Sequence, residues 1–108
     1  MIERYVLVGH TPIRCDDILA WACFFSNDDS RRVEFTQING DIGVSTVFLG
    51  LDHQWGNGPP LLFETMVFGG ELDGEQERYS TWEEAIEGHE NMCILVQYTI
   101  TNSDTEKE

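Results

Sequence analysis

The sequence of 108 residues is poor in basic side chains. Lys and Arg together number 6 against 20 Asp and Glu, so the formal net charge is −14 and the isoelectric point is near 4.3. Phosphate groups repel such a surface, which argues against direct binding of nucleic acid or of an anionic membrane. The longest apolar run, Ile18 to Phe25, is well short of the roughly 20 residues that span a bilayer. The N-terminus has no signal-peptide pattern, and we expect a soluble, cytoplasmic protein.

Cysteine is scarce as well. Cys15, Cys23 and Cys93 are odd in number and form no C-x-x-C pair, which argues against a disulfide-rich scaffold and a zinc ribbon. Cys23 and Cys93 have apolar neighbours in the sequence and are predicted to lie in the core.

Patterns typical of catalysis or metal binding are also absent. His10, His53 and His89 are scattered without the spacing of metal ligands, and no nucleophile elbow is present. The sequence therefore predicts no metal site, no cofactor and no enzymatic activity.

The chain does contain enough apolar residues to form one hydrophobic core. Hydrophobic residues make up 41% of the sequence, too many for a disordered chain. We predict a single α+β domain at 1–100 and a flexible acidic tail at 101–108. The expected elements are a strand at 5–8, a helix at 15–26, strands at 33–38, 41–49, 61–68 and 76–79, and a helix at 82–96.

Local patterns support these elements. Asn39-Gly40 between two β-rich runs predicts a hairpin with a type I′ turn. Thr81 and Glu84 have the spacing of a capping box and predict the start of the second helix. Short connections favour an antiparallel sheet of four to five strands, with the two amphipathic helices packed on one face.

The acidic residues cluster between positions 71 and 90. Glu83, Glu87 and Glu90 would share one helix face without a lysine, although like charges at this spacing destabilise a helix by a few tenths of a kcal/mol per pair. The cluster is either a solvated face that favours solubility or a surface that binds a basic partner. Its members are Glu71, Asp73, Glu75, Glu77, Glu83, Glu84, Glu87 and Glu90.

A second set of residues suggests a small-ligand site around the glycine-bounded loop at 50–60. Trp55 could stack a nucleotide base and Arg78 could contact its phosphate. Two members also have structural explanations: Glu64 and Arg78 as an ion pair between strands, and His89 as a half-buried histidine with a hydrogen-bond partner. The set is Asp52, His53, Trp55, Asn57, Glu64, Arg78 and His89.

Four stretches carry a resemblance: STVFLGLDH at 45–53, GPPLLFETMVFGG at 58–70, RYSTWEEA at 78–85 and Gly88-His89. They resemble a family of small proteins encoded by bacteriophages and prophages, over roughly 33–96. The stretch 54–57 is less rich in glycine than in that family. The resemblance implies the cytoplasm of a host cell and supplies no catalytic residues.

Charge and resemblance together give the leading hypothesis. We expect a non-enzymatic phage accessory protein that inhibits a host or defence protein, for example of the CRISPR type, through an acidic surface that mimics DNA. The partner would have a basic surface, with no direct contact to nucleic acid or membrane, and a homodimer stays open. The alternatives are a protein that sequesters a nucleotide signal and a minor virion component.

Overall fold

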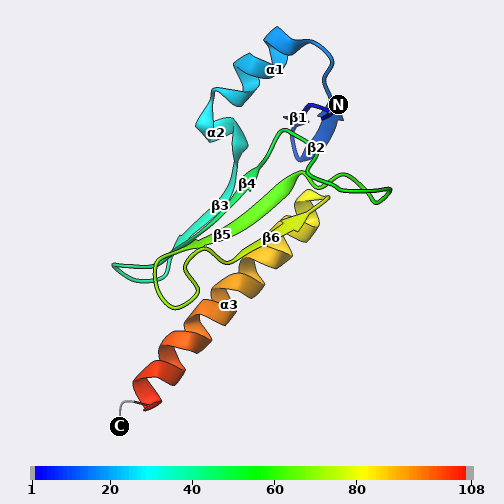
Figure 1. Ribbon diagram of the computed structural model, residues 1–108. Helices are drawn as coiled ribbons and strands as arrows, with labels where there is room; N and C mark the ends of the chain where they lie inside the picture. The colour runs from blue at the N-terminus through cyan, green and yellow to red at the C-terminus, as the bar shows by residue number, and fades with distance from the viewer. Residues whose placement is uncertain (1, 107–108) are drawn as a thin grey trace.

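The computed structural model describes residues 2–106 and is of the α+β class. Figure 1 shows a twisted sheet with one long helix along one side and a smaller hairpin and short helices at its far end. The elements are β1 (Tyr5–Val8), β2 (Thr11–Arg14), α1 (Ile18–Phe25), α2 (Asp28–Arg31), β3 (Arg32–Gln37), β4 (Gly43–Phe48), β5 (Phe63–Phe68), β6 (Gln76–Tyr79) and α3 (Trp82–Glu106).

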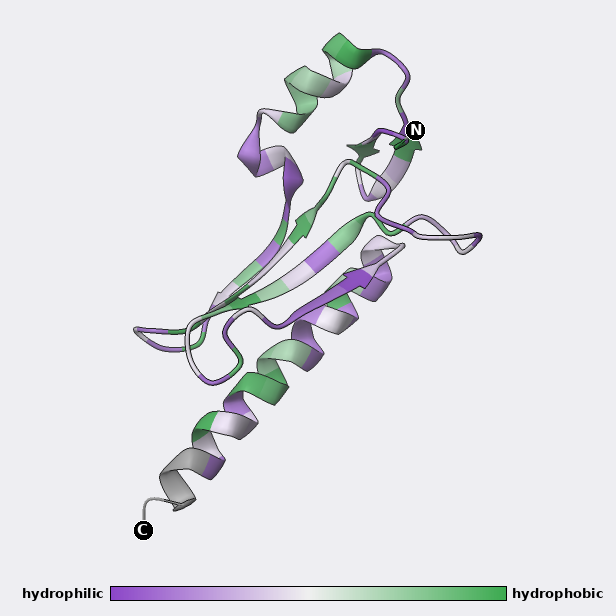
Figure 2. Cartoon of the chain, in the orientation of Figure 1, coloured by the Kyte–Doolittle hydropathy of each residue, from purple (hydrophilic) through white to green (hydrophobic). Residues whose placement is uncertain are grey.

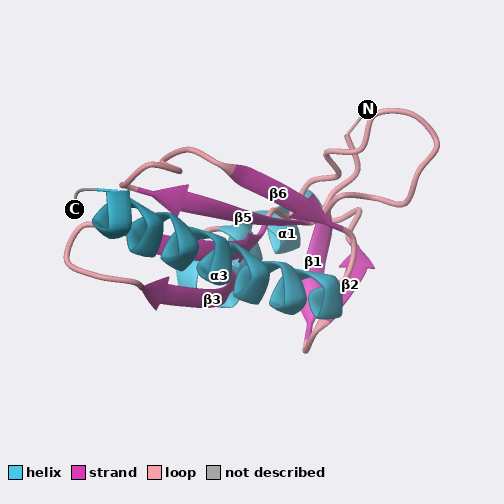
Figure 3. Ribbon diagram, turned by 90° about the horizontal axis from the view of Figure 1, so that it is seen from below, coloured by secondary structure: helices cyan, strands magenta, loops and turns pink. Residues whose placement is uncertain are grey.

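The main sheet has four antiparallel strands in the order β3-β4-β5-β6, as the short connections predicted. Register places Val44 opposite Val67 and Phe48 opposite Phe63, all four on the face that α3 covers. Figure 3 shows α3 lying across this face from end to end. Among the described residues, no helix packs along the opposite face of the sheet.

Two apolar clusters form the core, with a polar group between them. One cluster is built on Val44, Val67, Met92 and Val96, and the other on Phe48, Leu62, Phe63 and Ala85. Thr46, Thr65 and His89 lie between these clusters along β4, β5 and α3, and all three are buried. Each fully buried large apolar side chain contributes roughly 1.5–3 kcal/mol, so the sheet–helix interface supplies most of the stabilisation.

The prediction that two helices pack on one face of the sheet is wrong for the N-terminal region. The break at Gly9-His10 is a turn, and residues 11–14 return as β2 to form a separate two-stranded sheet with β1. The helix predicted at 15–26 begins at Ile18, because the Asp17 carboxylate caps it by accepting from the backbone N–H groups of Leu19 and Ala20. No residue of this helix is fully buried, and it reaches the core only at the end of the sheet, where Phe24 packs against Phe48. Within residues 2–106, α3 is the helix that lies along the main sheet.

The connection between β3 and β4 is a hairpin, as predicted, but its turn is not of type I′. Gly40 does not adopt the positive φ that such a turn requires. Instead the Asn39 side chain accepts hydrogen bonds from the backbone N–H groups of Asp41 and Ile42 at 2.8 and 2.9 Å. The side chain of Asn39 thereby closes a longer loop between Ile38 and Ile42.

The predicted start of α3 is confirmed and its predicted end is wrong. Thr81 Oγ1 accepts from the Glu84 backbone N–H, and Glu84 Oε1 accepts from that of Thr81, both at 3.1 Å. The helix continues to Glu106, so residues 101–106 are helical and only 107 and 108 of the expected tail lie outside the described residues. Cys23 is exposed, which corrects its assignment to the core, whereas Cys93 is half-buried and packs against the cluster that contains Met92 and Val96.

Candidate functional site

The acidic residues predicted from the sequence lie on neighbouring elements. The β5–β6 turn carries Glu71 and Asp73, and the edge strand β6 follows, packed beside α3. Figure 2 shows hydrophilic residues along β6 and the N-terminal half of α3. We call the following set the acidic surface: Glu71, Asp73, Glu75, Glu77, Glu83, Glu84, Glu87 and Glu90, every one of them exposed.

No salt bridge within residues 2–106 neutralises this surface. The basic residues that form ion pairs are Arg14, Arg31 and Arg78, and their partners all lie elsewhere in the chain. Arg78 belongs to β6, yet it pairs with Glu64 on the sheet face away from α3. Because successive side chains of a strand point to opposite faces, Arg78, the nearest basic residue, lies away from the acidic surface.

Two members of the acidic surface also support the backbone. Asp73 accepts a hydrogen bond from the Gly69 N–H at 2.7 Å, and Glu84 belongs to the capping box. The other six side chains make no hydrogen bond or salt bridge within the described residues. Their charges are therefore available to a partner.

The structure adds one acidic residue that sequence reasoning missed. Exposed Glu34 on β3 lines a cavity of about 320 Å³ beside α3, together with Thr36, Ile86, His89, Glu90 and Cys93. Glu34 and Thr36 are two residues apart in a strand and share a face, and this spacing was the available signal. The negative charge therefore continues around α3 toward β3.

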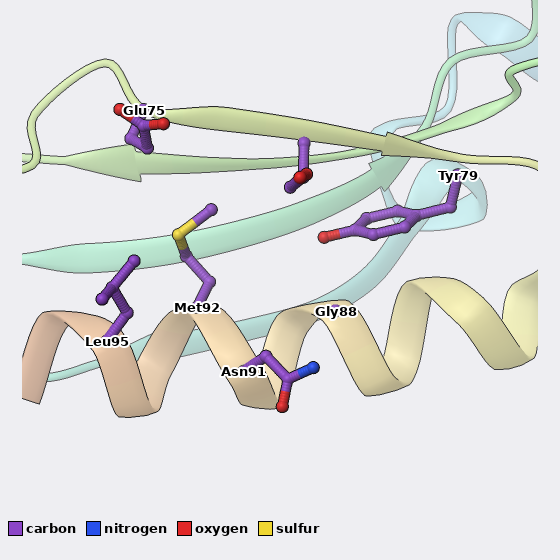
Figure 4. Close-up of a pocket in the computed structure, with 7 residues that line it drawn as sticks. Glu75, Tyr79, Gly88, Asn91, Met92 and Leu95 are labelled. Atoms are coloured by element: carbon purple, nitrogen blue, oxygen red, sulfur yellow. The ribbon is translucent and has the colours of Figure 1, made fainter.

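The opposite flank of α3 has a second cavity of about 320 Å³ (Figure 4). Tyr79 projects from β6 toward Gly88, and Met92, Leu95 and Asn91 follow along the helix. Burial raises the pKa of Tyr79, with the side chain of Thr65 opposing this change, so the phenol stays neutral at physiological pH. The apolar side chains of Met92 and Leu95 therefore lie beside the carboxylates of Glu75 and Glu77 in this cavity.

His89 has a structural environment, which confirms the prediction that it would have hydrogen-bond partners. Its Nε2 lies 2.9 Å from Thr36 Oγ1 and its Nδ1 lies 2.7 Å from Thr46 Oγ1. Thr46 Oγ1 is in turn 2.5 Å from Thr65 Oγ1. Burial lowers the pKa of His89, against the opposing charges of Glu34 and Glu90. Both ring nitrogens are thus engaged within the core.

The structure does not bring the second set of predicted residues together. Asp52 Oδ1 accepts from the backbone N–H groups of Gln54 and Leu61, so this carboxylate holds the loop closed. Trp55 is 92% exposed, and Asn57 is exposed beyond it. Asp52, His53 and Trp55 line a cavity of about 220 Å³. His89 lies beneath the sheet, and Glu64 and Arg78 lie on its other face.

Glu64 and Arg78 form the predicted pair. They are direct partners in the β5–β6 register, and Arg78 Nε donates to Glu64 Oε2 at 3.0 Å. The Glu64 side chain is only 13% exposed. A carboxylate that is so shielded from water needs a positively charged partner. The ion pair therefore gives both side chains a structural role within the sheet.

Within residues 2–106, no group of three or more His, Cys, Asp or Glu side chains is placed to hold a metal ion. Over the same residues, no helix has the length and apolar character needed to cross a membrane. No protein-family model, curated protein or solved structure matches the chain.

Proposed function

We propose that this chain is a non-enzymatic binding protein that occupies a basic, nucleic-acid-handling surface on another protein. The observation that carries the proposal is the acidic surface, whose eight carboxylates are all exposed and free of salt bridges within the described residues. A surface that only confers solubility usually has lysines interspersed among its acids. On this protein, the acidic surface along β6 and α3 has no lysine among its carboxylates.

A second feature supports a protein partner. The side chains beside the carboxylates are apolar and exposed, notably Ile94 at 68%, Leu95 at 45% and Tyr98 at 63% on α3. Carboxylates would meet the arginines and lysines that ordinarily bind phosphate, and the apolar side chains would add contact area. The combination suits a basic protein groove better than a small molecule.

The proposed partner is a host or defence protein, for example of the CRISPR type. This part rests on the resemblance to phage and prophage proteins, because small phage proteins of this kind commonly disable a host factor by binding it. An acidic inhibitor would act by excluding DNA or RNA from its partner, without any covalent step.

The experiment is an affinity capture from host lysate with matched variants. The test variant is Glu83→Gln/Glu87→Gln/Glu90→Gln, and the control is Asp16→Asn/Asp29→Asn/Asp41→Asn. Both remove three exposed negative charges, but the control changes none on the acidic surface. The proposal predicts a nucleic-acid-binding protein retained by the wild type and the control and lost with the test variant.

Salt provides the second readout. The Debye length falls from about 10 Å at 0.1 M to about 3 Å at 1 M, so the complex should release its partner over this range. Equal loss in both variants, or retention that salt does not change, would contradict binding through the acidic surface.

A further inference from the structure

Helix α1 is apolar along its whole length, yet much of its surface is exposed. Its sequence ILAWACFF has no charged residue, and none of its side chains is buried. Ile18 is 58% exposed and Leu19 is 76% exposed. Phe24 packs edge-on against Phe48 of the core, so one side of α1 is anchored to its own chain. A helix that is hydrophobic on all sides is normally enclosed by protein, and the side with Ile18 and Leu19 stays exposed.

The main sheet also has an uncovered face, opposite α3. Its apolar members are Phe35, Val47, Met66 and Phe68, of which Phe35 is 48% and Phe68 51% exposed. Figure 1 shows α1 beyond the end of the sheet, next to the β1–β2 hairpin, with the open side of the sheet facing away from α3. We call this the open face; its residues are Phe35, Ser45, Val47, Glu64, Met66, Phe68, Gln76 and Arg78.

The chain exposes more surface than a compact monomer of its mass. The chain exposes 7006 Å², whereas a compact monomer of this mass is expected to expose roughly 6,100 Å². The excess of roughly 900 Å² is close to the ~800 Å² that each partner buries in a standard stable interface. The radius of gyration, 15.9 Å, likewise exceeds the roughly 13 Å of a compact chain of this length.

Charge selects a second copy as the partner. In a chain of net charge −14, two copies repel each other over most of their surfaces. Helix α1 is uncharged, and the open face carries a single carboxylate, Glu64, which Arg78 neutralises. These are surfaces through which two such acidic chains can meet without unpaired like charges.

We propose that the chain forms a two-fold symmetric dimer in which α1 of each copy packs on the open face of the other. Two-fold symmetry makes the contact reciprocal, so both apolar surfaces of both copies are covered at once. The acidic surface flanks α3 on the other side of the sheet and stays exposed. The dimer is therefore independent of the proposed function.

The test is the mass of the full chain in solution, by sedimentation velocity over a range of concentrations from about 1 to 200 μM. The variants are Leu19→Asp on α1 and Phe68→Asp on the open face. The control is Ile94→Asp on the exposed side of α3, where the wild-type side chain is 68% exposed. Circular dichroism checks that each variant is folded, and Leu19→Ser replaces Leu19→Asp if that variant is not.

The proposal predicts a wild-type species of twice the 12.3 kDa chain mass. Each test variant should weaken dimerisation at least roughly tenfold, because an aspartate would be desolvated in the interface. The control should dimerise as the wild type does. A wild type that stays monomeric throughout overturns the proposal, as does a dimer that either test variant leaves intact or that Ile94→Asp disrupts.

Discussion

The ring of Tyr79 lies directly against Gly88 of α3, at the crossing of the helix and strand β6. A Cβ at position 88 would overlap Cζ and the hydroxyl oxygen of this tyrosine. Glycine is unfavourable inside a helix by roughly 0.5–1 kcal/mol relative to alanine, so its presence here needs a packing reason. The reason is that α3 must approach the edge strand closely enough for the ring to lie on its backbone.

Gly88→Ala should therefore destabilise the fold, although alanine is the better helix former. We expect a net loss of about 1–2 kcal/mol, since overpacking typically costs about 1–3 kcal/mol. Urea unfolding measures the change, and exposed Asn91→Ala on the same helix should stay within about 0.5 kcal/mol of wild type or gain stability. A Gly88→Ala variant more stable than wild type would show that the ring moves aside freely.

His89 predicts a specific pH dependence of stability. Its pKa is lowered in the folded state by burial, so the unfolded chain binds a proton more readily. Its contribution is complete above the unfolded-state pKa of about 6.5 and is lost as the pH falls below it, with a slope of at most about 1.4 kcal/mol per pH unit.

Urea unfolding between pH 5 and 8 measures this slope. The contribution of His89 to the pH dependence of the unfolding free energy should disappear in His89→Gln and persist in His53→Gln. An unchanged slope in His89→Gln would show that other groups cause the acid sensitivity.

The Glu64–Arg78 pair should stabilise the protein more than the exposed ion pairs do. Arg78→Met leaves a carboxylate that is only 13% exposed without its partner, and we expect a loss of about 1–2 kcal/mol, between the ranges for exposed and buried pairs. The matched control is Arg14→Met, whose partners Glu3 and Asp16 are largely in solvent; it should cost less than about 1 kcal/mol. A double-mutant cycle with Glu64→Gln isolates the pair, and zero coupling energy would contradict this interpretation.

Two residues of the loop at 50–60 should differ in their contribution to stability: Asp52 should contribute and Trp55 should not. Asp52→Ala removes an acceptor for two backbone N–H groups and is expected to cost about 1–2 kcal/mol in thermal or urea unfolding. Trp55→Ala should change stability by less than about 0.5 kcal/mol, because its side chain is 92% exposed. The opposite ranking would mean that Trp55 packs on the core.

Most of the main sheet could be predicted because its signals are local. The alternation in β5, the Thr81–Glu84 capping box and the lone Arg78 opposite Glu64 each specify their own structure. The turn type failed because the side chain of Asn39 provides hydrogen bonds that compete with a two-residue turn.

The position of the first helix could not be predicted for a different reason. An apolar helical stripe predicts burial but does not identify what buries it, and α1 is only partly covered by its own chain, through Phe24 on Phe48. The end of α3 was missed in two parts. Residues 101–106 are polar and give no periodic signal, whereas Ile100, four residues after Val96, continues the apolar stripe and was the available signal for 97–100. For the candidate site, the eight acids were evident from sequence. The spacing of Glu34 and Thr36 placed them on one face of a strand, but that this face lies beside α3 follows only from the packing of distant segments.

We propose that the acidic surface takes the place of nucleic acid on a basic partner. Its most direct test is competition: fluorescently labelled duplex DNA is bound to the captured partner, and the purified protein is titrated in while anisotropy is followed. We expect that the wild type displaces the DNA and that Glu83→Gln/Glu87→Gln/Glu90→Gln needs at least about ten times the concentration. A ternary complex, in which the DNA stays bound while the protein binds, would contradict it.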